Sequence, residues 1–79
     1  MSEPTAKEKN LQRIAFAGSV IAFTRENAPD LTDDESAVVD LLANLMHFCK
    51  ATKQDFREYL RQARIHFNEE VREEQDGSL

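Results

Sequence analysis

The chain has 79 residues, a net charge of −5, and 41% hydrophobic and 32% charged residues. A chain of this length forms one domain at most and buries a modest core, so a lone monomer would be marginally stable. Cys49 is the only cysteine, which excludes a disulfide framework and favours a reducing, cytoplasmic compartment. The longest apolar run, 14–23, has ten residues. A membrane-spanning helix needs roughly 20, so no membrane partner is expected.

The pattern of the chain predicts an all-α fold of three helices in a single domain over 1–79. Only two glycines and two prolines occur, and the turn signals of β-hairpins are absent. The two connections are short, and short links usually make sequential helices antiparallel neighbours. We therefore expect a three-helix bundle, or a helical hairpin with an added arm. Residues 1–4 and 75–79 are expected to be disordered.

The first helix is predicted over 5–27. Pro4 and Thr5 mark its start, and Pro29 disfavours the α conformation at the residue before it. Its apolar residues lie on more than one side, which is typical of a helix buried between neighbours. Small residues around Gly18 would let another helix approach closely, and such packing would offset the cost of about 1 kcal/mol for glycine in a helix.

The second helix is predicted over 33–50. Thr32 at the N-cap and Glu35 three residues later form the pattern of a capping box. The apolar arc of this helix covers roughly half of its circumference at the 3.6-residue period, so it is predicted to be the most buried of the three. Because such wide arcs exceed what a single small chain can cover, we expect a homodimer. The residues predicted for the dimer interface are Phe16, Val20, Phe23, Leu45 and Met46.

The third helix is predicted over 53–74, with Thr52 as its N-cap and Asp55 at the third helical position. Its apolar positions form a clean amphipathic stripe, which predicts that one side packs and the other faces solvent. The members of the stripe are Phe56, Leu60, Ala63, Phe67 and Val71, with Tyr59 at one edge.

Charge is unevenly distributed along the chain. Residues 1–49 carry −4, residues 50–68 carry +3 and residues 69–79 carry −4. Within the basic segment, four side chains fall within about 80° of arc on the third predicted helix at the 3.6-residue period. We call these four residues the basic stripe; they are Lys53, Arg57, Arg61 and Arg64.

Two interpretations of the basic stripe stay open. In one, it contacts phosphate or an acidic protein surface, and the third helix occupies the recognition position of a helix-turn-helix. In the other, it is a solvated flank whose charges pair with Glu58, with the acidic start of the second helix, or with a second subunit. The second interpretation is favoured, because charged faces of surface helices are commonplace.

Two acidic clusters, 30–35 and 69–76, flank the basic segment. The first is explained by negative charge at the positive end of a helix dipole. The second opposes the dipole at a helix C-terminus, so either fraying or a basic partner is expected there. A small acidic protein could also imitate nucleic acid or mask a basic surface, but capping and solubility of the tail are the favoured explanations.

No residue pattern points to catalysis. Cys49 lies at the centre of an apolar arc, which favours a buried small hydrophobe over a nucleophile. His47 and His66 do not occur at metal-ligand spacing, and no phosphate-binding, dinucleotide-binding or zinc-protease motif is present. We therefore expect a protein that is not an enzyme, with no catalytic, cofactor-binding or metal-binding residues.

Three segments, 41–49 (LLANLMHFC), 55–56 (DF) and 63–67 (ARIHF), resemble short uncharacterised helical proteins of bacterial plasmids and phages. The similarity covers roughly residues 32–68. It implies a cytoplasmic accessory protein of a mobile element and carries over no catalytic residues. It raises two roles, a regulator of the element's own genes and an inhibitor of a host defence.

The function that we predict from the sequence is that of a non-enzymatic interaction protein. It would act as a homodimer and bind another macromolecule, because wide apolar arcs coincide with the absence of a reaction centre. The alternative is a small DNA-binding transcriptional regulator that uses the basic stripe to contact phosphates and guanine edges.

Overall fold

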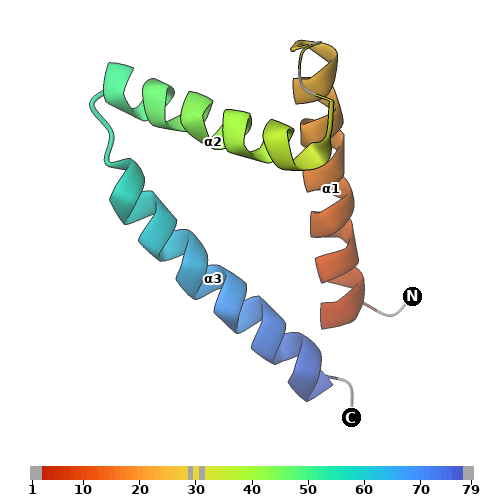
Figure 1. Ribbon diagram of the computed structural model, residues 1–79. Helices are drawn as coiled ribbons and strands as arrows, with labels where there is room; N and C mark the ends of the chain where they lie inside the picture. The colour runs from red at the N-terminus through yellow and green to blue at the C-terminus, as the bar shows by residue number, and fades with distance from the viewer. Residues whose placement is uncertain (1–2, 29, 31, 78–79) are drawn as a thin grey trace. The chain divides into compact units, whose positions relative to one another are not determined.

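The computed structural model describes residues 3–28, 30 and 32–77. Over these residues it contains three α-helices and no strand: α1 (Ala6–Glu26), α2 (Asp34–Ala51) and α3 (Phe56–Gly77) (Figure 1). The predicted all-α fold of three helices is confirmed. The bounds of α1 and α2 differ from the predicted ones by one residue at each end. In contrast, α3 begins and ends three residues later than predicted.

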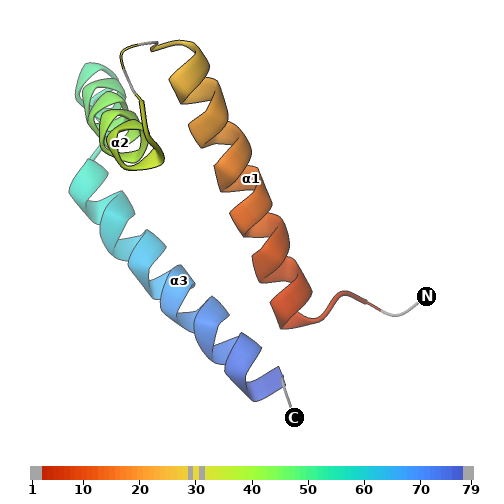
Figure 2. The same cartoon turned by 45° about the vertical axis from the view of Figure 1, so that its right-hand side comes forward.

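Contacts divide the chain into two units. One unit combines Met1–Phe16 with Arg57–Leu79, and the other is Ala17–Phe56. The first half of α1 therefore belongs with α3, whereas its second half belongs with α2. Figure 2 shows α1 along its length as an unbroken helix, although its two halves contribute to different units.

Side chains cap both ends of α1. At its start, the Thr5 hydroxyl accepts a hydrogen bond of 3.1 Å from the backbone N–H of Glu8, so the predicted role of Thr5 is confirmed. At its end, the Asn27 side-chain amide donates a hydrogen bond of 2.9 Å to the Phe23 carbonyl, which satisfies an acceptor of the last turn. Pro29, on which the predicted end depended, lies outside the described residues.

The prediction that Thr32 caps α2 is wrong. Asp33 is the N-cap, with extended backbone angles, and its carboxylate accepts a hydrogen bond of 2.7 Å from the Ser36 N–H. The physical reason is that both residues are good caps, but the helix begins at Asp34, which puts Asp33 in the flanking position. Thr32 instead offers its backbone carbonyl to Arg25, at 3.1 Å.

The connection after α2 also differs from the prediction. Thr52 is the C-cap of α2 and not the N-cap of α3, and Lys53 lies in a turn with a φ of 59°. The Lys53 N–H bonds to the Lys50 carbonyl at 3.3 Å, and the Gln54 N–H bonds to the Cys49 carbonyl at 2.8 Å. These two bonds define a Schellman motif, whose left-handed position is usually occupied by glycine. The turn delays the start of α3 to Phe56.

The core of the described chain is very small. Only Ala37 and Cys49 are buried among the described residues, and both belong to α2. The predictions that Cys49 is buried and that the second helix is the most buried are confirmed. The prediction that α1 is buried between neighbours is wrong, since α1 has no buried residue. A Cβ added at Gly18 would meet no atom within 4 Å, so no close helix packing offsets that glycine.

Candidate interaction surfaces

The residues predicted for a dimer interface lie on two helices and are mostly exposed. Phe16 is 73% exposed and Phe23 is 65% exposed on α1, while Val20 is half-buried. On α2, Leu45 is 43% exposed and Met46 is 55% exposed. Aromatic and aliphatic side chains of this size are normally inside a folded protein. These positions are therefore available to a partner, and their role in dimerisation stays a prediction.

The basic stripe does not lie on one helix. Arg57, Arg61 and Arg64 belong to α3, but Lys53 lies in the preceding turn. The prediction that all four residues share a helical face is therefore wrong for Lys53. The reason is that residues 52–54 form the Schellman motif, so Lys53 lies before the start of α3 and does not follow its helical period.

One member of the basic stripe is neutralised within α3. Arg61 forms two hydrogen bonds with the Glu58 carboxylate, 2.9 Å from Nε and 2.6 Å from a terminal nitrogen. Such a forked contact is the strong form of an arginine–carboxylate pair. The hydrogen bonds from Arg61, and secondarily that from Gln62, lower the pKa of Glu58, and Glu58 in turn raises the pKa of Arg61. The predicted pairing with Glu58 is thus confirmed for this residue.

The other two arginines of the stripe are not neutralised. Arg57 and Arg64 form no ion pair in the part of the chain that the structure describes. Both side chains are exposed and lie on the same side of α3, about 20° apart at the helical period. Together with Lys53, which is exposed in the preceding turn and forms no ion pair among the described residues, they keep positive charge available to an anionic partner.

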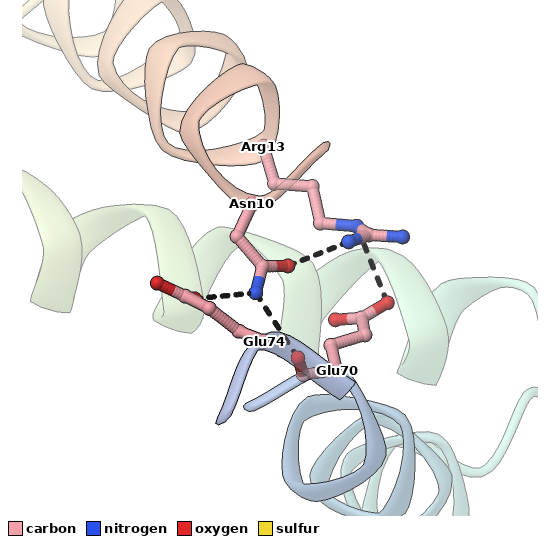
Figure 3. Close-up of polar contacts among 4 residues, drawn as sticks. All are labelled: Asn10, Arg13, Glu70 and Glu74. Carbon is pink, nitrogen blue, oxygen red and sulfur yellow. Dashed lines mark hydrogen bonds and ion pairs between the residues drawn. The ribbon is translucent and has the colours of Figure 1, made fainter. Parts of the chain in front are cut away.

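A polar cluster joins the start of α1 to the end of α3, both within one unit (Figure 3). The Asn10 amide nitrogen donates to the Glu70 carbonyl at 3.1 Å and to the Glu74 carboxylate at 2.8 Å. A terminal guanidinium nitrogen of Arg13 donates a hydrogen bond of 2.6 Å to the Asn10 side-chain oxygen, and the Arg13 Nε lies 3.3 Å from the Glu70 carboxylate. We call these four residues the α1–α3 clasp.

The sequence does not predict the α1–α3 clasp as a whole, although its acidic C-terminal segment indicates one half of it. An acidic helix C-terminus was expected either to fray or to have a basic partner, and Arg13 is that partner for Glu70. The other sequence feature that bears on the clasp is spacing: Asn10 and Arg13 are three residues apart, and Glu70 and Glu74 are four residues apart. Each pair shares one helical face, but nothing in the sequence pairs the two faces.

Histidine and acidic side chains are among the usual ligands of metal sites. The described residues contain no group of three or more histidine, cysteine or acidic side chains that would hold a metal ion. His47 and His66 are both exposed, and the Asp40 carboxylate accepts a hydrogen bond of 3.3 Å from Asn44. Among the described helices, none combines the length and the hydropathy needed to cross a membrane.

Comparisons with protein-family descriptions, with curated proteins and with solved structures found no match to this chain. The resemblance to helical proteins of plasmids and phages therefore stays a prediction.

Proposed function

We propose that this chain is a non-enzymatic interaction protein that acts as a homodimer and binds another macromolecule. The observation that carries this proposal is the contrast between two buried residues and a long series of exposed large apolar side chains over the described chain. Large exposed apolar surfaces mark sites of association in soluble proteins. Burial of those side chains is also the main free-energy term that could offset the conformational entropy of ordering the chain.

Sedimentation equilibrium over the micromolar range tests the homodimer. The expected result is a dimer of the 9.1 kDa chain, weakened when Phe16 and Phe23 or Leu45 and Met46 are replaced by serine. Ala43→Ser is a matched control, since it introduces the same polar group on a polar side of α2. A folded wild-type chain that stays monomeric throughout this range would overturn the proposal.

A second candidate function is DNA binding by a small transcriptional regulator. Arg57 and Arg64 favour it, because their charges are not compensated within the described chain. Arginine suits phosphate and guanine contacts through its planar set of donors. This candidate agrees with the regulatory role that the plasmid and phage resemblance implies.

Mobility shifts on duplex DNA test this second candidate. Phosphate contacts release counterions, so binding at about 50 mM salt should weaken steeply by about 200 mM. Arg57→Glu together with Arg64→Glu should abolish binding, whereas Arg72→Glu, near the other end of α3, serves as the control. Absence of any shift of the wild type at about 50 mM salt excludes the DNA-binding function.

A further inference from the structure

Five of the six exposed large apolar side chains of α2 share one side of the helix, which we call the outer α2 face; the sixth, Phe48, lies on another side. At 100° per residue the five side chains lie within about 120° of arc. The exposed fraction of these side chains ranges from 38% for Val38 to 62% for Val39. Ala37 is fully buried and Leu41 is half-buried on a different side of the same helix, whereas Cys49, which follows Leu45 by one turn on the side of the outer α2 face, is buried. The outer α2 face consists of Val38, Val39, Leu42, Leu45 and Met46.

We propose that a second copy of this chain covers the outer α2 face, with the two α2 helices antiparallel and Leu42 at the two-fold axis. Glu35 of each copy then meets Lys50 of the other. This inference rests on the homodimer of the proposed function and assigns its interface.

The spacing of the outer α2 face is symmetric about Leu42. Val38 and Val39 lie four and three residues before it, and Leu45 and Met46 lie three and four residues after it. A two-fold interface requires a surface that is complementary to itself. In an antiparallel pair, positions equally far before and after the axis face each other, so every level of this seam holds apolar groups on both sides.

The charges at the two ends of the seam are complementary in the same arrangement. Glu35 precedes the seam and Lys50 follows it; both are exposed, and neither forms an ion pair among the described residues. At the helical period Glu35 lies about 20° and Lys50 about 80° from Leu42, both toward the side that carries Val39 and Met46. Like flanks meet in an antiparallel two-fold pair, so Glu35 of one copy lies beside Lys50 of the other.

Charge also disfavours the parallel arrangement. Parallel helices in register would place the acidic first turn of α2, with Asp34 and Glu35, against the same turn of the partner. Lys50 in the last turn would likewise face Lys50. Antiparallel helices oppose acidic turns to basic ones and align their dipoles favourably.

Glu35 and Lys50 cannot meet within one chain. They are fifteen residues apart on a continuous helix, or roughly 22 Å along its axis. Any energetic coupling between these two side chains therefore reports a contact between copies. This separation makes charge reversal a clean test of the proposed interface.

The experiment compares Glu35→Lys, Lys50→Glu and their equimolar mixture by sedimentation equilibrium, with circular dichroism as the check on helix content. Each variant alone places like charges together twice per dimer. We expect self-association to weaken roughly tenfold for each, given the usual strength of exposed ion pairs. The mixture forms two attractive pairs, so association should return to within about threefold of wild type.

Matched controls lie off the seam. Ser36→Lys puts the same charge in the first turn of α2, and His47→Glu puts a negative charge near its end, but neither position belongs to the outer α2 face. Each control should weaken association less than the corresponding seam variant, because its charge lies outside the arc of the outer α2 face and is more strongly screened. Leu42→Lys should weaken association at least a hundredfold, since it forces two charges together at the axis.

The outcomes separate this inference from the proposed function. Restored association in the mixture supports the antiparallel α2 interface. A dimeric wild type whose mixed variants stay as weak as each alone overturns this interface and leaves the homodimer standing. A wild-type chain that stays monomeric overturns both.

Discussion

Arg13 and Glu70 lie in different helices, and the guanidinium Nε of the first is 3.3 Å from the carboxylate of the second. The Arg13 side chain is half exposed and that of Glu70 is 29% exposed, so this ion pair contributes modestly, about 0.2–1 kcal/mol. Arg13 also positions Asn10, because it donates a hydrogen bond to the Asn10 side-chain oxygen. The Asn10 amide nitrogen in turn donates to Glu70 and Glu74.

The first prediction concerns Asn10. Replacement by alanine removes its hydrogen bonds to the Glu70 carbonyl and the Glu74 carboxylate, and should lower the free energy of unfolding by about 1–2 kcal/mol. Asn10→Asp should cost more, since it adds a negative charge beside two carboxylates. Urea denaturation measures both. Gln12→Ala on the same helix is the control, and an equal loss there would remove the α1–α3 clasp as the cause.

The second prediction concerns the N-cap of α2. Asp33→Ala should reduce the helix content of α2, whereas Thr32→Ala should leave it unchanged, because only the Asp33 carboxylate accepts the Ser36 N–H. Amide chemical shifts of residues 34–37 report the loss directly. The reverse order of effects would restore Thr32 as the cap.

The third prediction is a pH dependence at the same position. The hydrogen bonds from Ser36, with a smaller contribution from the Arg25 charge, lower the pKa of Asp33 in the folded chain. A lowered pKa means that the cap contributes fully above the unfolded value, about 3.9, and is lost as pH falls through the folded value. NMR titration should show the low midpoint. Asp33→Asn should remove this part of the acid sensitivity, and an unshifted midpoint in the wild type would contradict the assignment.

The fourth prediction concerns the Schellman motif after α2. Lys53 occupies the left-handed position with φ of 59°, where a side chain costs about 1 kcal/mol relative to glycine. Lys53→Gly should therefore stabilise the chain by about 1 kcal/mol, and Lys53→Val should destabilise it, because a β-branched residue tolerates this conformation poorly. Thermal unfolding measures both. A loss of stability in the glycine variant would show that the lysine side chain, and not the backbone, matters here.

The fifth prediction separates the members of the basic stripe. Because Arg61 lowers the pKa of Glu58, Arg61→Gln should move the Glu58 midpoint back toward its ordinary range, as measured by NMR. Arg57→Gln should leave it in place, since Arg57 forms no ion pair with Glu58 and does not contribute to the lowered pKa. If the chain binds DNA, Arg61→Gln should also weaken that binding less than Arg57→Gln, because the Arg61 charge is already compensated.

Local signals in the sequence predicted the helices well, because helix formation depends on neighbours along the chain. Thr5 was recognised as the start of α1, and Cys49 was placed correctly from the period of α2. The errors at Thr32, Thr52 and Lys53 have two origins: a choice between adjacent caps at Thr32, and an unpredicted Schellman motif at Thr52 and Lys53. Adjacent residues such as Thr32 and Asp33 are both competent caps, and a difference of one residue is set by the fit of the whole helix.

The sequence by itself determined the three amphipathic segments, their charge asymmetry and the excess of apolar surface over the size of the chain. Only the tertiary structure decided that Asn10 and Arg13 meet Glu70 and Glu74, that Arg57 and Arg64 keep free charge while Arg61 does not, and that the outer α2 face is exposed. The physical reason is that periodicity places residues on a face of one helix. Which faces meet depends on contacts between residues far apart along the chain.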